Sequence, residues 1–395
     1  MKSTQHTHVQ KIDEIAATLL EAPRNQEIGL YSGNAGLSLF LFYYARFKNA
    51  TAIHQKATEV VDELFTQIET TPQLLFTLCS GIAGVGWLVD HLCKQGFLQA
   101  NPDEILSDID EYVYQAALNN LHRGNFDFMH GAMGMVFYLA KRNRQDYLHH
   151  LVQALNDIAI WDGDCAKWQS IIRHEEGISG FNIALSHGSS AIALVLCKIL
   201  QIMPKEETAK RLLQGAVKYI LNQEIPVAQY GCHFPSFSIE SQPELFQTRL
   251  AWCYGDVGVA LAIWQSGLQL QNQAWTDKGM EVLLHAAHRR GLPENRVQDA
   301  GICHGAAGIA HIFNRLHRNT GRMEFKDAAD YWCKEALAMG TLEDGLAGYK
   351  TYYTEAYGGW QPKSSLLEGI AGIGLCLLSF VMEEDPAWDE CLLLS

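Results

Sequence analysis

The sequence predicts an all-α protein, a closed double-layered α/α toroid of seven helical-hairpin repeats. Three observations indicate this fold class. A glycine-rich turn recurs along the chain at intervals of 48 to 67 residues. Each turn is followed by a nearly continuous apolar run, and the segments between the runs have one apolar stripe. The first and last turns are as apolar as the middle ones, whereas an open solenoid needs polar repeats at its ends.

The recurring turn has the pattern Gly-x-x-Gly, because glycine permits tight turns and close approach of neighbouring backbone. One such turn would indicate little, but seven at comparable spacing predict a repeat architecture. In chain order the turns begin at Gly33, Gly81, Gly131, Gly188, Gly255, Gly305 and Gly369. The fourth is degenerate, since Ala191 stands where its second glycine would be.

The apolar run after each turn predicts a helix that is buried on most sides, as in residues 36–45, 191–200 and 372–381. Segments such as 57–65 and 210–220 predict amphipathic helices that cover the buried ones. Two helices in each of seven repeats give about fourteen helices. No linker or charge run marks a boundary, so we expect a single domain over residues 1–395.

The composition excludes several functional classes. The 395 residues are 48% hydrophobic, which is enough for a large core, and the net charge of −14 disfavours nucleic acids and anionic membranes. Ten irregularly spaced cysteines in a chain of this length indicate reduced thiols rather than a disulfide scaffold. The N-terminus does not resemble a signal peptide, and no apolar run reaches the length of a membrane span. We therefore expect a cytoplasmic protein.

Reactive side chains are concentrated just before the first glycine of the middle turns. In turns three to six the preceding residues are His130, His187, Tyr254 and His304. If the ring closes, these positions face one another at one end of the inner helices. Residues that are far apart in the sequence would then meet.

Cys253 and Cys303 occupy the same position in consecutive repeats, and His304 follows the second cysteine. Two thiolates and an imidazole are good ligands for Zn²⁺, and a three-ligand set leaves a fourth position open for a substrate. The alternative is that both cysteines are simply buried in their turns, as free cysteines commonly are. We favour zinc because of the softness and number of the ligands, although the spacing fits no standard zinc finger.

His187 is a candidate general acid or base, since imidazole titrates near neutral pH; it could equally be a partly buried turn residue. Asp127 is either an N-cap or the carboxylate that orients His187. Arg249 is either a surface charge or the group that holds an anion near the metal. Tyr254 is either a core aromatic or a proton-sharing phenol. His130 precedes the first glycine of its turn, as His187 does, and the sequence assigns it no role.

The chain resembles the lanthionine synthetase C-like (LanC) cyclases, the thioether-forming enzymes of lantibiotic biosynthesis. The resemblance is carried by residues 249–255 (RLAWCYG), 303–305 (CHG), 182–188 (NIALSHG) and 127–131 (DFMHG). All seven glycine turns fit the seven-repeat toroid of that family, so the resemblance spans nearly the whole chain. His130, Ser186 and Ala191 depart from the commoner family residues, and none of them is a proposed ligand.

The resemblance implies Zn²⁺ bound by Cys253, Cys303 and His304, acid–base roles for His187 and Asp127, and supporting roles for Arg249 and Tyr254. It implies an enzyme that adds cysteine thiolates to dehydroalanine or dehydrobutyrine of a dehydrated precursor peptide (leader plus core), giving lanthionine or methyllanthionine rings. The length leaves no room for a dehydratase or kinase domain. We therefore expect a stand-alone cyclase, with a separate dehydratase and an exporter as partners.

Other functions stay open on the sequence alone. Protein prenyltransferases also combine an α/α toroid with zinc, but no basic set is evident for a diphosphate. A six-repeat α/α glycosidase would need paired carboxylates, and only Asp127, Asp256 and Glu368 are near the turns. The remaining alternatives are a LanC-like protein that adds glutathione to dehydrated residues and a non-catalytic, zinc-stabilised toroid that binds peptides.

Overall fold

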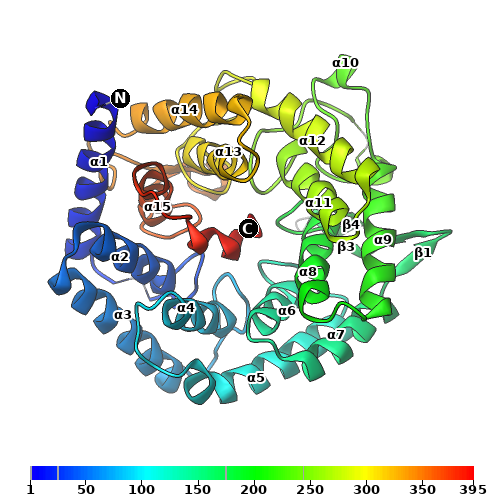
Figure 1. Ribbon diagram of the computed structural model, residues 1–395, viewed down its shortest axis with the longest axis horizontal. Coiled ribbons are helices and arrows are strands. Elements are labelled where there is room, and N and C mark those ends of the chain that lie inside the picture. The colour runs from blue at the N-terminus through cyan, green and yellow to red at the C-terminus, as the bar shows by residue number, and fades with distance from the viewer. Residues whose placement is uncertain (1, 25, 174–175, 243) are drawn as a thin grey trace. The chain divides into compact units, whose positions relative to one another are not determined.

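The computed structural model describes residues 2–24, 26–173, 176–242 and 244–395 (Figure 1). The chain forms two compact units. Unit 1 comprises residues 1–75, 79–105 and 291–395, and unit 2 comprises residues 76–78 and 106–290. The single domain expected over residues 1–395 stays a prediction. None of the helices in the described part of the chain has the length and hydropathy that a membrane span requires.

Unit 1 is built from apolar helices that begin at glycine turns and from more polar helices packed against them. The apolar helices are α2 (Asn34–Lys48), α4 (Ile82–Lys94), α13 (Ala306–Thr320) and α15 (Ile370–Val381). The others are α1 (Lys2–Glu21), α3 (Thr51–Thr70) and α14 (Met323–Ala338). Helix α3 packs against α2 and α14 against α13. These pairs are the hairpins that the alternation of apolar and striped segments predicts.

The last repeat of unit 1 is completed by the start of the chain. Helix α1 packs against α15, and α15 also contacts α2, so the blue and red ends of the chain lie side by side in Figure 1. The backbone N–H of Leu367 donates to the carbonyl of Tyr31 (3.0 Å), and the N–H of Tyr31 donates to the carbonyl of Cys79 (3.0 Å). The N–H of Cys303 donates to the carbonyl of Leu367 (3.0 Å). Backbone hydrogen bonds thus join turns six, seven, one and two, and each uses the residue two positions before the first glycine of its turn.

Unit 2 repeats the same construction around three apolar helices. These are α6 (Ala132–Lys141), α8 (Ser189–Ile202) and α11 (Asp256–Gln269), and α8 contacts both of the others. The more polar helices are α5 (Pro102–His122), whose first turn belongs to unit 1, α7 (Gln145–Asp157), α9 (Glu207–Leu221) and α12 (Gln273–His288). A short helix, α10 (Val227–Tyr230), follows α9 and precedes α11 along the chain. As in unit 1, a turn-to-turn bond is present: the N–H of Ser186 donates to the carbonyl of Cys253 (3.3 Å).

Short antiparallel hairpins lie in the segments between helices. Between α7 and α8, β1 (Ile160–Asp162) pairs with β2 (Cys165–Lys167), and β3 (Gln169–Arg173) pairs with β4 (Ile178–Phe181). In unit 1, β5 (Thr351–Tyr352) pairs with β6 (Trp360–Gln361) before the seventh turn. The 3₁₀ segments are η1 (Ile239–Ser241), η2 (Glu355–Tyr357) and η3 (Ala387–Leu392). Strands of two to five residues are too short to give a periodic sequence signal.

In the first turn, both glycines are required by close backbone approach. In the first turn, a Cβ on Gly33 would lie 2.2 Å from the carbonyl oxygen of Glu27. A Cβ on the second glycine, Gly36, would lie 2.3 Å from the carbonyl oxygen of Leu30. No ordinary side chain fits at such distances. The turn thus fixes the residues just before each apolar helix, which are the ones with reactive side chains.

Candidate functional site

His187 and Asp127 come from different turns of unit 2 and meet in the structure. His187 precedes α8 and Asp127 precedes α6, and His187 Nδ1 lies 2.6 Å from Asp127 Oδ2. Their side chains are 27% and 23% exposed, respectively. The pair is therefore held within the fold and still open to a substrate. Because Nδ1 is engaged, Nε2 is the nitrogen left for proton exchange.

Asp127 contacts His187, as the second interpretation of the sequence predicts, and it also stabilises its own turn. Its Oδ1 accepts the backbone N–H of Met129 (2.8 Å) and of His130 (2.7 Å), so one oxygen stabilises the turn. Its Oδ2 is free of that task and pairs with His187. The carboxylate is not the N-cap of α6, since Gly131 occupies that position.

Asp127 and His187 shift each other's pKa in opposite directions. Burial lowers the pKa of His187, but the hydrogen bond and charge of Asp127 outweigh burial, and the pKa lies above its ordinary value. Burial raises the pKa of Asp127, but the hydrogen bond with His187 outweighs this, and that pKa lies below its usual range. At neutral pH the carboxylate is charged, and His187 takes up a proton more readily than an isolated imidazole.

We expect Asp127→Asn to lower the pKa of His187, because the amide removes the negative charge that favours the imidazolium. The measurement is a pH titration of the His187 ring by NMR. Asp164→Asn is the control, because Asp164 pairs with Lys218 on the surface of the same unit. An unchanged His187 titration in Asp127→Asn would contradict the assignment of Asp127 as the dominant partner.

The same substitution has a predictable effect on the pH dependence of stability. The raised pKa of His187 contributes stability that is present below its unfolded pKa and is lost as pH rises through the folded pKa. The lowered pKa of Asp127 contributes stability that is present above its unfolded pKa and is lost as pH falls through the folded pKa. The loss of unfolding free energy in Asp127→Asn should therefore be largest between about pH 4 and pH 6.5.

Two aromatic side chains flank His187. The ring of His130 is stacked 6.0 Å from it, and the ring of Tyr254 lies 6.0 Å away at a tilt. The hydroxyl of Tyr254 accepts a long hydrogen bond (3.4 Å) from the side-chain amide of Asn182. The sequence assigned no role to His130, and the structure places its ring against that of His187, the candidate acid–base residue. Tyr254 is half-buried and not a core residue.

The turn of Cys253 is bonded to the turn of His187. The carbonyl of Cys253 accepts from the backbone N–H of Ser186 (3.3 Å) and from its hydroxyl (3.2 Å). Cys253 is buried before α11, and its charge is a further cause of the raised pKa of His187. Arg249 lies half-buried at the start of this turn, and no described carboxylate forms an ion pair with it. Ser186, a departure from the common family residue, therefore serves to join two site-bearing turns.

In unit 1, Cys303 and His304 lie half-buried in the turn before α13. His304 Nε2 is 3.4 Å from Oδ2 of Asp299, whose side chain is 1% exposed. Burial raises the pKa of Asp299, but its hydrogen bond with His304 outweighs this and holds the pKa below the usual range. Sequence reasoning missed Asp299, because it stands six residues before the glycine and not in the two positions compared among the turns.

Two carboxylates considered for a glycosidase have structural partners. Asp256 is fully buried, accepts the backbone N–H of His233 (3.0 Å) and Phe234 (2.9 Å), and lies 3.6 Å from Arg289. Burial raises its pKa in spite of these partners. Glu368 accepts a hydrogen bond from the hydroxyl of Tyr353. Neither carboxylate is presented as a free acid or base.

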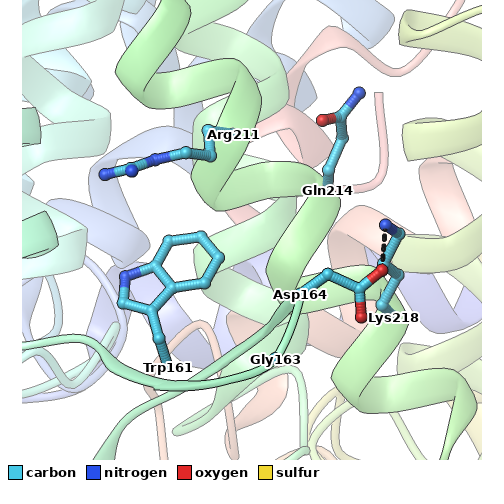
Figure 2. A pocket seen from close by; sticks show the side chains of 6 residues that line it. All are labelled: Trp161, Gly163, Asp164, Arg211, Gln214 and Lys218. Atoms are coloured by element: carbon cyan, nitrogen blue, oxygen red, sulfur yellow. Dashed lines mark hydrogen bonds and ion pairs between the residues drawn. The ribbon is translucent and has the colours of Figure 1, made fainter.

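A pocket of about 410 Å³ lies elsewhere in unit 2, between the β1–β2 hairpin and α9 (Figure 2). Its charged groups are already engaged: Lys218 pairs with Asp164 at 2.5 Å, and the Arg211 guanidinium lies 4.9 Å from the centre of the Trp161 ring. None of the site residues predicted from the sequence lines this pocket. Pocket size therefore does not locate the candidate site.

Comparison with known proteins gives a consistent result. The family model for lanthionine synthetase C-like proteins matches residues 25–393. Nisin biosynthesis protein NisC of Lactococcus lactis subsp. lactis is 24% identical over 406 residues, which cover 93% of this chain and 89% of that protein. A solved structure of a nisin cyclase matches with a TM-score of 0.77 at 20% identity, covering 100% of this chain and 98% of that one.

These matches confirm the predicted fold class, an all-α toroid. The fold, together with the motifs before the glycine turns, defines an enzyme of the lanthionine synthetase class. The chain belongs to the lanthionine synthetase C-like family.

Proposed function

We propose that this protein is a zinc-dependent cyclase that forms lanthionine and methyllanthionine rings in a dehydrated precursor peptide, leader plus core. The observation that carries the proposal is the 2.6 Å contact between His187 and Asp127. The turn that contains His187 is hydrogen-bonded to the turn of Cys253. An acid–base residue is thereby held next to a thiol with the chemistry of a metal ligand. The family and the names of the two relatives support the same substrate class.

Cys253, Cys303 and His304 are the residues that would hold the zinc ion, through two sulfurs and one imidazole nitrogen. The donor set fits this metal, because thiolates and imidazole are its usual ligands and three of them leave one position open. When bound, the ion supplies Lewis acidity that stabilises a substrate thiolate at neutral pH, where a free thiol with a pKa of about 8.5 is mostly protonated.

The reaction requires one bond to form and one proton to move. The substrate sulfur loses its proton and bonds to the β-carbon of dehydroalanine or dehydrobutyrine, and the resulting enolate gains a proton at the α-carbon. His187 is suited to carry this proton, because Asp127 holds Nδ1 and raises the pKa while Nε2 remains for exchange. It takes the thiol proton or delivers one to the enolate.

Arg249 and Tyr254 would support this step. Arg249, half-buried and without a described carboxylate partner, would hold the negative oxygen of the enolate or a peptide carbonyl. Tyr254 would share a proton beside His187, with its hydroxyl positioned by Asn182. The partners would be a separate dehydratase, which makes the substrate, and an exporter. The protein would act in the cytoplasm, and its net charge of −14 gives no attraction to nucleic acid.

The experiment that tests this function is cyclisation of a dehydrated peptide that contains cysteine. Ring closure removes a thiol that an alkylating reagent would otherwise label, and it leaves the peptide mass unchanged. Addition of glutathione would increase the mass, so the same experiment separates the two activities.

A further inference from the structure

Turns three, four and six share a feature six residues before their first glycine. Asn125, Asn182 and Asp299 stand there, and the Oδ1 of each accepts the backbone N–H two residues further on, at 3.4, 2.8 and 2.9 Å, respectively. The carbonyl of each also accepts the N–H of the residue after the glycine, at 3.1, 2.9 and 3.0 Å. An asparagine is sufficient to build this turn. The turn therefore does not explain why residue 299 is an aspartate.

The second carboxylate oxygen of Asp299 makes contacts that an amide could not reproduce. Oδ2 accepts the backbone N–H of Tyr352 at 2.9 Å and lies 3.4 Å from His304 Nε2. The Nδ2 group of an asparagine is only a donor, so in this orientation it would face the backbone N–H of Tyr352. Since the side chain is 1% exposed, water would not relieve that conflict.

We propose that Asp299 is a positioning residue that holds the Nε2–H of His304, so that Nδ1 is the nitrogen presented to the metal. This inference rests on the proposed function. Imidazoles that bind metals usually donate their other N–H to a carboxylate or carbonyl, which fixes the tautomer and the ring orientation. Tyr352 lies in β5, so the hairpin before the seventh turn anchors the carboxylate that orients a ligand of the sixth turn.

The test is the zinc affinity of the full-length protein, measured by competition with a chromophoric chelator. Asp299→Asn keeps the Oδ1 contact that turns three and four make with asparagine, so the turn should still form. The unpaired N–H of Tyr352 should lower the melting temperature of the metal-free protein by the same amount whether or not His304 is present. Zinc affinity should fall about 10- to 100-fold, the usual effect of losing the carboxylate behind a ligand imidazole.

A double-mutant cycle separates positioning from a general effect on the fold. In the His304→Ala background, no imidazole remains to be oriented, and the weaker zinc affinity of the two cysteines is measured at equilibrium against a chelator of lower affinity. Adding Asp299→Asn there should change zinc affinity less than about twofold. An equal loss in both backgrounds, or no loss in the single variant, would overturn the proposal. Absence of zinc from the wild-type protein is a different result, because it would refute the proposed metal site itself.

Discussion

Replacing His187 with alanine should slow thioether formation about 10²- to 10⁴-fold while the protein keeps its zinc. This is the range typical of a lost general acid or base. The proton removed from the thiol would then have no positioned carrier, since Asp127 would remain as a charged carboxylate without its imidazole. The measurement is the single-turnover rate of ring closure, with metal content determined on the same sample.

His149→Ala is the matched control for this variant. His149 also pairs with a carboxylate, Glu206, in unit 2, but its side chain is 53% exposed and lies outside the site. The control should cyclise at the wild-type rate. A wild-type rate in His187→Ala would remove His187 from the mechanism, whatever the metal content.

Replacing Cys303 with alanine should abolish stoichiometric zinc binding and, with it, ring closure. The wild-type protein should carry about one zinc per chain, because one three-ligand set is proposed. With one thiolate gone, only Cys253 and His304 remain, and two ligands hold zinc too weakly to survive dialysis. The metal content after dialysis, measured by mass spectrometry of the element, is the readout.

Cys93→Ala is the control for the loss of a thiol, since Cys93 is also half-buried in unit 1 and lies in the last turn of α4, away from the glycine turns. It should retain the zinc. Full retention of zinc in both Cys253→Ala and Cys303→Ala would refute the metal assignment.

The repeat architecture was predictable because its signal is redundant. The first turn needs glycine at Gly33, where a Cβ would collide with backbone, and the helix that follows it, α2, is buried from Asn34 to Ala45. The apolar first and last turns predicted that the ends of the chain meet, but not that α1 would be the helix that packs against α15, because no local pattern encodes such a contact. The β hairpins were missed because their strands are too short for a periodic signal.

The candidate site was predictable to the extent that its residues adjoin a glycine turn. Contact between Asp127 and His187 was one of two interpretations that the sequence left open, and the structure places the two side chains 2.6 Å apart. Their catalytic roles stay a prediction. Asp299 was overlooked, although a signal existed: a carboxylate stands where two other turns have Asn125 and Asn182. The stacking of His130 on His187 depends on side-chain directions that spacing does not give.

The most direct test of thioether cyclisation is a count of alkylatable thiols in a dehydrated, cysteine-containing peptide after incubation with the purified protein. We expect the thiols to become resistant to alkylation at unchanged peptide mass, with wild-type protein but not with Cys303→Ala. A matched peptide that keeps its cysteines but has serine in place of each dehydroalanine should keep all its alkylatable thiols. Thiols that remain fully alkylatable in the presence of zinc-loaded wild-type protein would contradict the account.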